Sequence, residues 1–206
     1  MKPEYWNRAK RALARRDPVM GGIMRAHPRI FLVRRGEPFM TLARAIVGQQ
    51  ISVKAAQSVW DRVVTCVGGE VSPQTVLGRQ RPLLRACGLS DRKTEYICDL
   101  AQHFANGSIH VHRWPEMTDE AIIAELVEVR GIGRWTAEMF LIFSLLRPDV
   151  FPLDDLGLQK GIRLAYFAGR KVSPKRMQKL GEAWRPWRSV ATWYLWRSLD
   201  PLPVEY

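Results

Sequence analysis

The chain has 206 residues, of which 47% are hydrophobic and 10% are aromatic, and its net charge is +12. A chain of this size and composition can bury a core in one domain or in two small lobes, which excludes a largely disordered protein. Its longest apolar stretches, such as 139–146, are too short to cross a bilayer, so we expect no membrane partner. The polar and basic residues 1–16 are followed by no apolar stretch, so we expect no secretory signal peptide.

Apolar residues recur at helical spacing along most of the chain, which predicts an all-α protein of roughly ten helices with short connections. Only the run from Ile30 to Val33 has the character of a short strand. Distinct helices are predicted over 5–15, from Phe39 to Val47, after caps at Ser52, Asp91 and Thr118, from Ser173-Pro174 onward, and over 187–199.

The basic charge is concentrated toward the C-terminal end. Nine Lys and Arg residues lie between Lys160 and Arg188, where Glu182 is the one acid. A generic basic surface would explain the net charge, but this clustering favours a polyanionic partner. The three cysteines have no spacing typical of a zinc or iron–sulfur site, and we interpret them as reduced thiols of an intracellular protein, cytoplasmic and nucleoid-associated if bacterial.

The segment Leu126-Val-Glu-Val-Arg-Gly-Ile-Gly-Arg-Trp-Thr-Ala-Glu-Met139 is the most informative. A helix is predicted to end near Val129 and a second to begin near Arg134, with a tight hairpin of Gly131, Ile132 and Gly133 between them. The hairpin amides and the second helix's N-terminus would hold a phosphate of the DNA backbone without reading sequence. An isolated Gly-x-Gly is usually only a helix cap and turn, but the two flanking helices and the basic charge favour the phosphate site.

A pair of acids, Asp154 and Asp155, follows in the segment 151–161 at a predicted helix start. Aspartate at such a position commonly caps the helix and needs no catalytic role. The alternative is that one Asp caps the helix while the other faces a cleft as an anion.

Together these segments resemble the helix–hairpin–helix (HhH-GPD) DNA glycosylases, in which such a hairpin is followed by an essential Asp. The resemblance covers roughly 38–198 and includes 45–56, 87–97, 182–189 and 193–196, of which the last two resemble bacterial 3-methyladenine DNA glycosylase II. It implies an all-α fold of two helical lobes with a cleft between them, without the N-terminal β-rich domain of the enterobacterial type. The central lobe would be 36–149, and 1–35 with 150–206 would form the lobe that carries the catalytic Asp.

By the same resemblance, Asp155 is the catalytic aspartate and Asp154 a capping or structural neighbour. A fixed carboxylate suits the reaction because cleavage of an N-glycosidic bond builds positive charge on the deoxyribose. Trp135 stands where bifunctional relatives have a nucleophilic lysine, which implies a monofunctional enzyme that uses water. No cysteine follows Cys98, so the resemblance implies no iron–sulfur cluster. It implies no required cofactor, and a monovalent cation at the hairpin.

The resemblance also assigns a base pocket and a DNA-binding set. Trp135, Met139 and Trp196 would form the pocket, although either tryptophan could instead belong to the core. Met139 replaces an aromatic residue of the enterobacterial type. Gln50 would fill the gap left by the flipped base, a role that Gln49 or a neighbouring loop could take instead. The remaining DNA-binding residues would be Gly131, Ile132, Gly133, Arg134 and Lys160, the last two of which could also be ordinary solvated helix charges.

The sequence therefore predicts a monomeric, monofunctional glycosylase of base excision repair that flips alkylated purines such as 3-methyladenine out of double-stranded DNA. Two rivals remain: a glycosylase for deaminated or oxidised bases, and a non-catalytic DNA-binding damage sensor.

Overall fold

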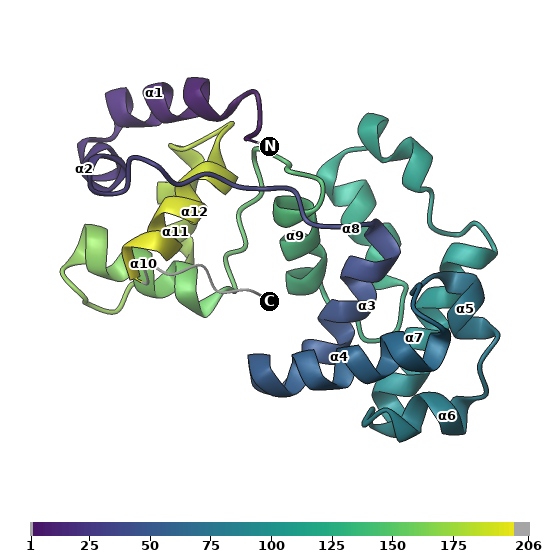
Figure 1. Cartoon of the computed structure of the whole chain (residues 1–206). Coiled ribbons are helices and arrows are strands. Elements are labelled where there is room, and N and C mark those ends of the chain that lie inside the picture. Colours follow the sequence, from purple (N-terminus) through teal and green to yellow (C-terminus); the bar gives the residue numbers. More distant parts are fainter. Residues whose placement is uncertain (1, 200–206) are drawn as a thin grey trace. The chain divides into compact units, whose positions relative to one another are not determined.

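The computed structural model describes residues 2–199, and within that range its regular elements are all helices, with no strand (Figure 1). This confirms the all-α prediction. The described residues form two compact units, one of 2–34 with 141–199 and one of 35–140. The sequence predicts that the central lobe ends at residue 149. In the structure the corresponding unit ends at residue 140, inside the continuous helix α9 (Arg134–Phe143), where the apolar pattern of the sequence has no break. Residues 200–206, which we assign to the second lobe, lie outside the described residues.

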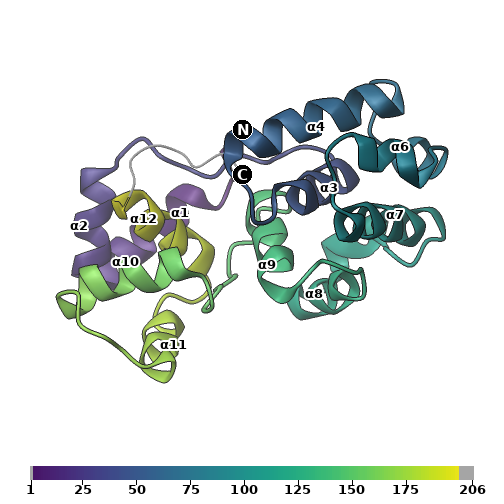
Figure 2. The same cartoon turned by 90° about the horizontal axis from the view of Figure 1, so that it is seen from below.

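The first unit is a cluster of helices around α12. It contains α1 (Trp6–Arg16), α2 (Pro18–Ala26), α10 (Leu156–Phe167), α11 (Pro174–Glu182) and α12 (Arg188–Leu199). Helix α12 packs against α1, α2 and α10 (Figures 1 and 2). The largest side chains that are fully buried here are Trp6, Trp184 and Tyr194. A Cβ on Gly161 would lie 3.2 Å from the Leu195 carbonyl oxygen, so α10 approaches the α12 backbone closely.

Asp17, between α1 and α2, connects these two helices to the rest of this unit through hydrogen bonds. Its Oδ1 accepts from the Met20 amide at 2.9 Å and caps α2. Its Oδ2 accepts from the Tyr166 hydroxyl at 2.7 Å and from the Trp184 indole at 2.9 Å. Burial, and then the bond to Asp17, raise the pKa of Tyr166. The start of the chain is thereby tied to α10, the helix that follows Asp155.

The second unit contains the hairpin. Its helices are α3 (Pro38–Gly48), α4 (Val53–Val67), α5 (Pro73–Leu77), α6 (Arg81–Ala86), α7 (Asp91–Ala105), the 3-10 helix η1 (Val111–Glu116), α8 (Asp119–Val127) and α9 (Arg134–Phe143), of which the last three residues, 141–143, belong to the first unit. Helix α7 packs against α3, α5 and α6. Leu42, Ile46, Ile97 and Leu100 are fully buried in this unit. In the described part of the chain, no helix is both long and apolar enough to cross a membrane.

Two of the predicted caps are confirmed and one is wrong. The Ser52 hydroxyl accepts from the Ala55 amide and that of Thr118 from the Ala121 amide, each at 3.2 Å. The cap of α7 is Ser90, not Asp91, and Asp91 is the first helical residue. Both residue types cap helices, and an acid in the first turn also suits the helix dipole, so the sequence cannot separate the two. The strand-like run at Ile30 forms no strand and has no regular structure.

Candidate active site

The hairpin lies between α8 and α9, at the place that the sequence predicts. Gly131 has a φ of +84°, and Gly133 has no positive φ. Ile132 is buried, and its amide donates to the Val129 carbonyl at 3.1 Å. Gly133 is exposed, and a Cβ added there would meet no atom within 4 Å. The second glycine therefore presents bare backbone to solvent at the start of α9, as a phosphate site requires.

Gly131 is held against the ring of Tyr96. A Cβ at Gly131 would lie 2.2 Å from Tyr96 Cδ2, a separation that Cβ atoms do not tolerate. We expect Gly131→Ala to lower the free energy of unfolding by about 2–5 kcal/mol, because left-handed strain and overpacking add. Gly107→Ala is the control, since Gly107 has a φ of +78° and open space around it. Denaturant unfolding of both variants checks this expectation. An equal loss of unfolding free energy in Gly131→Ala and Gly107→Ala would show that the clash with Tyr96 contributes nothing.

Arg134 is engaged by two carboxylates. Its Nη1 and Nη2 donate to Glu120 at 3.0 and 2.5 Å, and its Nε donates to Glu138 at 3.1 Å. The bonds to Glu120, and then the charges of Glu120 and Glu138, raise the pKa of Arg134 against the effect of burial. A contact with phosphate would have to compete with these ion pairs, so the structure favours a structural role for Arg134 at the start of α9.

The two glutamines that follow α3 differ in their surroundings. Gln49 is half-buried, and its Nε2 donates to the Gly131 carbonyl at 2.8 Å. Gln50 is exposed and has a φ of +59°, a conformation that is unusual for a residue with a Cβ. The structure thus makes Gln49 a link between this loop and the hairpin and leaves Gln50 to face solvent.

Asp155 stands at the N-terminus of α10 with one oxygen fixed by two donors. Its Oδ1 accepts from the Leu158 amide at 2.6 Å and from the Trp196 indole at 2.8 Å. Asp154 is exposed and is not the cap. The expectation that Asp154 takes the capping role is therefore wrong: the helix begins at Leu156, and the residue directly before it provides the cap.

Trp196 reaches Asp155 from α12, as part of an aromatic cluster. Its ring stacks on Phe143, with centroids 5.8 Å apart and planes at 16°. Trp193 lies edge-on to both rings. A Cβ on Gly157 would meet both Asp155 Oδ1, at 3.1 Å, and the Trp196 indole, so this glycine leaves room for the hydrogen bond. The arrangement fixes the direction of the carboxylate, a function of Trp196 beyond the pocket wall that the sequence predicts.

The other two predicted pocket residues lie on α9. Trp135 is 41% exposed and so is not a core residue, and Met139 is half-buried. Because they are four positions apart, they share one face of the helix. Lys160 is exposed on α10.

The structure thus gathers the predicted residues in two groups. The unit of 35–140 holds the hairpin with Gln49, Gln50, Arg134, Trp135 and Met139, and the other unit holds Asp155, Trp196 and Lys160. Phe143, Lys93 and Tyr96 support these groups and were missed. Their partners are distant in sequence, and only Lys93 and Tyr96, which lie in the segment 87–97, carried a signal, through the resemblance.

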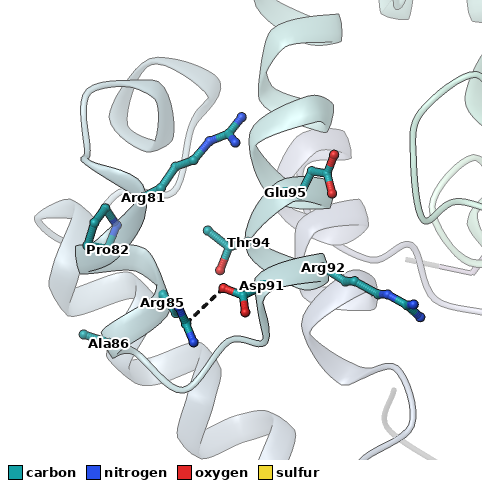
Figure 3. Close-up of a pocket in the computed structure, with 8 residues that line it drawn as sticks. All are labelled: Arg81, Pro82, Arg85, Ala86, Asp91, Arg92, Thr94 and Glu95. Carbon is teal, nitrogen blue, oxygen red and sulfur yellow. Dashed lines mark ion pairs between the residues drawn. The ribbon is translucent and has the colours of Figure 1, made fainter.

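A pocket elsewhere in the second unit contains none of these residues. It has a volume of about 770 Å³ and lies between α6 and α7, where Arg85 forms an ion pair with Asp91 at 3.0 Å (Figure 3). Among residues 2–199, no group of three or more His, Cys, Asp or Glu side chains could hold a metal ion.

The hairpin carbonyls are compatible with the monovalent cation that the resemblance implies. The Val129 and Gly131 carbonyls each accept one hydrogen bond. A carbonyl oxygen has a second lone pair, so neither bond prevents it from acting as an oxygen ligand. The cation stays a prediction.

Comparison with known proteins gives the family. An all-α chain with two helices around a glycine hairpin and an Asp before a later helix has the features of a helix–hairpin–helix repair protein. Residues 43–186 match the HhH-GPD superfamily of base excision DNA repair proteins, and the chain belongs to this superfamily.

Its relatives include a DNA-3-methyladenine glycosylase 1 of Schizosaccharomyces pombe, 34% identical over 81% of this chain and 74% of the relative. A crystal structure of a DNA-3-methyladenine glycosidase from Bacillus halodurans is similar with a TM-score of 0.85 and 34% identity, over 92% of this chain and 87% of that one. A 3-methyladenine DNA glycosylase of S. pombe in complex with abasic DNA is similar with a TM-score of 0.81 and 30% identity, over 97% and 99% of the two chains.

Proposed function

We propose that this protein is a monofunctional DNA glycosylase that hydrolyses the N-glycosidic bond of alkylated purines in double-stranded DNA. The observation that carries the proposal is the Asp155 carboxylate, whose Oδ1 is fixed by the Trp196 indole and the Leu158 amide, in a chain of the HhH-GPD superfamily. The names of its relatives support the alkylpurine class.

The carboxylate acts on the charge that appears during cleavage. As the bond between the base and the deoxyribose breaks, the electron pair leaves with the base and positive charge develops on the sugar. A fixed anion lowers the energy of that transition state and can orient the water that attacks the sugar. An alkylpurine that already carries a positive charge leaves without help from a general acid. Hydrolysis consumes water besides the DNA, so we propose that no cofactor is required.

The identity of residue 135, a tryptophan, supports cleavage of the glycosidic bond without a subsequent lyase step. A bifunctional enzyme needs an amine at this place to attack the sugar, and Trp135 provides none. Water is then the nucleophile, and the products are a free base and an abasic site. Treatment of the reaction with borohydride is expected to trap no covalent adduct between enzyme and DNA.

We propose that positive charge on the lesion selects the substrate. Trp135 offers an exposed indole, and Met139, four residues along α9, is a soft and adaptable neighbour. An electron-rich face attracts a cationic base more strongly than a neutral one. The pocket should therefore accept 3-methyladenine and 7-methylguanine and disfavour neutral lesions.

We expect Trp135→Ala to reduce the preference for cationic over neutral lesions by about 2- to 30-fold, which corresponds to about 0.5–2 kcal/mol of cation–π attraction. Trp135→Phe should retain part of it. Single-turnover excision of 7-methylguanine, 8-oxoguanine and uracil measures the preference. Faster removal of 8-oxoguanine or uracil by the unaltered protein would contradict the charge-based selection and favour a glycosylase of another specificity.

A further inference from the structure

Lys93 connects α7 to the C-terminal end of α3. Its Nζ donates to the carbonyls of Val47 and Gln49, each at 2.7 Å. The last carbonyls of a helix have no partner within the helix, and a cation placed there also complements the helix dipole. Burial lowers the pKa of the Lys93 ammonium. The hydrogen bonds to the two carbonyls therefore replace part of the hydration that the ammonium loses on burial.

The residue that follows these carbonyls is strained. Gln50 has a φ of +59°, which a side chain with a Cβ adopts only when its surroundings enforce it. Before it, Lys93 fixes the backbone, and the Gln49 side chain donates to the Gly131 carbonyl at 2.8 Å. After it, Ser52 caps α4 through the Ala55 amide. Gln50 itself remains exposed at the tip of this loop.

We propose that Lys93 is a positioning residue for base flipping. By holding the carbonyls of Val47 and Gln49, it keeps Gln50 in the left-handed conformation from which its side chain enters the space that a flipped base leaves. The inference rests on the proposed function and on the prediction that Gln50 fills the gap, and it adds to them a residue that acts through the backbone of this loop. The hydrogen bond between Gln49 and Gly131 joins the same loop to the hairpin. The loop that carries Gln50 is therefore attached to the segment that is predicted to bind phosphate.

The test compares Lys93→Met with Arg92→Met. Methionine has nearly the length of lysine but no donor, and Arg92 is an exposed neighbour whose loss removes the same charge. We expect Lys93→Met to slow single-turnover release of 7-methylguanine by about 10-fold, equivalent to about 1.4 kcal/mol, with affinity for undamaged duplex unchanged. Arg92→Met should leave the rate as it is, and Lys93→Arg, which keeps the donors, should recover most of it.

A fluorescence measurement reports the insertion itself. In a duplex that carries a tetrahydrofuran abasic analogue, 2-aminopurine opposite the analogue becomes brighter when an inserted side chain unstacks it. Lys93→Met should lose most of this signal. If Lys93 acts through Gln50, Lys93→Met should have no further effect in a Gln50→Ala background. An undiminished rate and signal in Lys93→Met, or full additivity with Gln50→Ala, would overturn the proposal.

Two controls separate the other ways in which the test could fail. Thermal unfolding shows whether each variant is folded, and Lys93→Gln, which is too short to reach both carbonyls, replaces Lys93→Met if that variant is unfolded. If the unaltered protein releases no alkylated base, the proposed function fails, but the fluorescence comparison still decides the role of Lys93.

Discussion

Asp155→Asn is expected to slow the release of alkylated bases by about 10²-fold or more, with affinity for DNA retained or increased. The structure makes this substitution unusually informative. Asparagine caps helices as well as aspartate does, and its Oδ1 can still accept from Leu158 and Trp196. The fold and the orientation of the side chain should therefore survive, and the negative charge alone is lost.

Asp154→Asn is the matched control. It removes the same charge from the adjacent position, where the side chain is exposed and does not cap α10. Single-turnover rates and duplex affinities of both variants decide the assignment. Near-normal base release by Asp155→Asn, with a large loss in Asp154→Asn, would move the catalytic role to Asp154.

Gly133→Asp is expected to weaken binding to every duplex sequence alike, by about 10-fold or more, because it places a carboxylate where the hairpin backbone is predicted to bind a phosphate. The salt dependence should also become shallower, by about one unit in the slope of log K against log salt, if one phosphate contact is lost. The fold should tolerate the change, since a Cβ at Gly133 meets no atom within 4 Å and the φ is not positive.

Gly133→Ala separates size from charge. It adds the Cβ without the carboxylate, so the difference in affinity between the two variants measures the effect of the charge. Fluorescence anisotropy with undamaged duplexes of different sequence, at several salt concentrations, provides the data. Equal affinities of the unaltered protein and Gly133→Asp would show that the hairpin has only a structural function.

Local patterns predicted most of the fold. Helical spacing of apolar residues located the long helices, and Ser52 and Thr118 marked two helix starts that the structure confirms. The hairpin was predictable because its requirements are local: a glycine where φ is positive and an apolar residue that is buried beside it. Ser90 and Asp91 show the limit of local reasoning, since two adjacent residues that both suit a cap cannot be ranked without coordinates.

The details of the candidate site depend on partners that are distant in sequence. Trp196 is 41 residues from Asp155, and Lys93 is 46 and 44 residues from the carbonyls that it holds. Arg134 has a typical sequence context for a phosphate contact, yet Glu120 is 14 residues away and engages its guanidinium. No periodicity or spacing encodes these pairs, because they form only when separate helices pack together.

The profile of bases released from methylated duplex DNA tests the central claim most directly. The purified chain is incubated with DNA treated with a methylating agent, and the free bases are separated by chromatography, with Asp155→Asn as the control. We expect 3-methyladenine, accompanied by 7-methylguanine, from the unaltered protein and neither base above background from the variant. Release of no base, or of equal amounts by both proteins, would contradict an alkylpurine glycosylase that depends on Asp155.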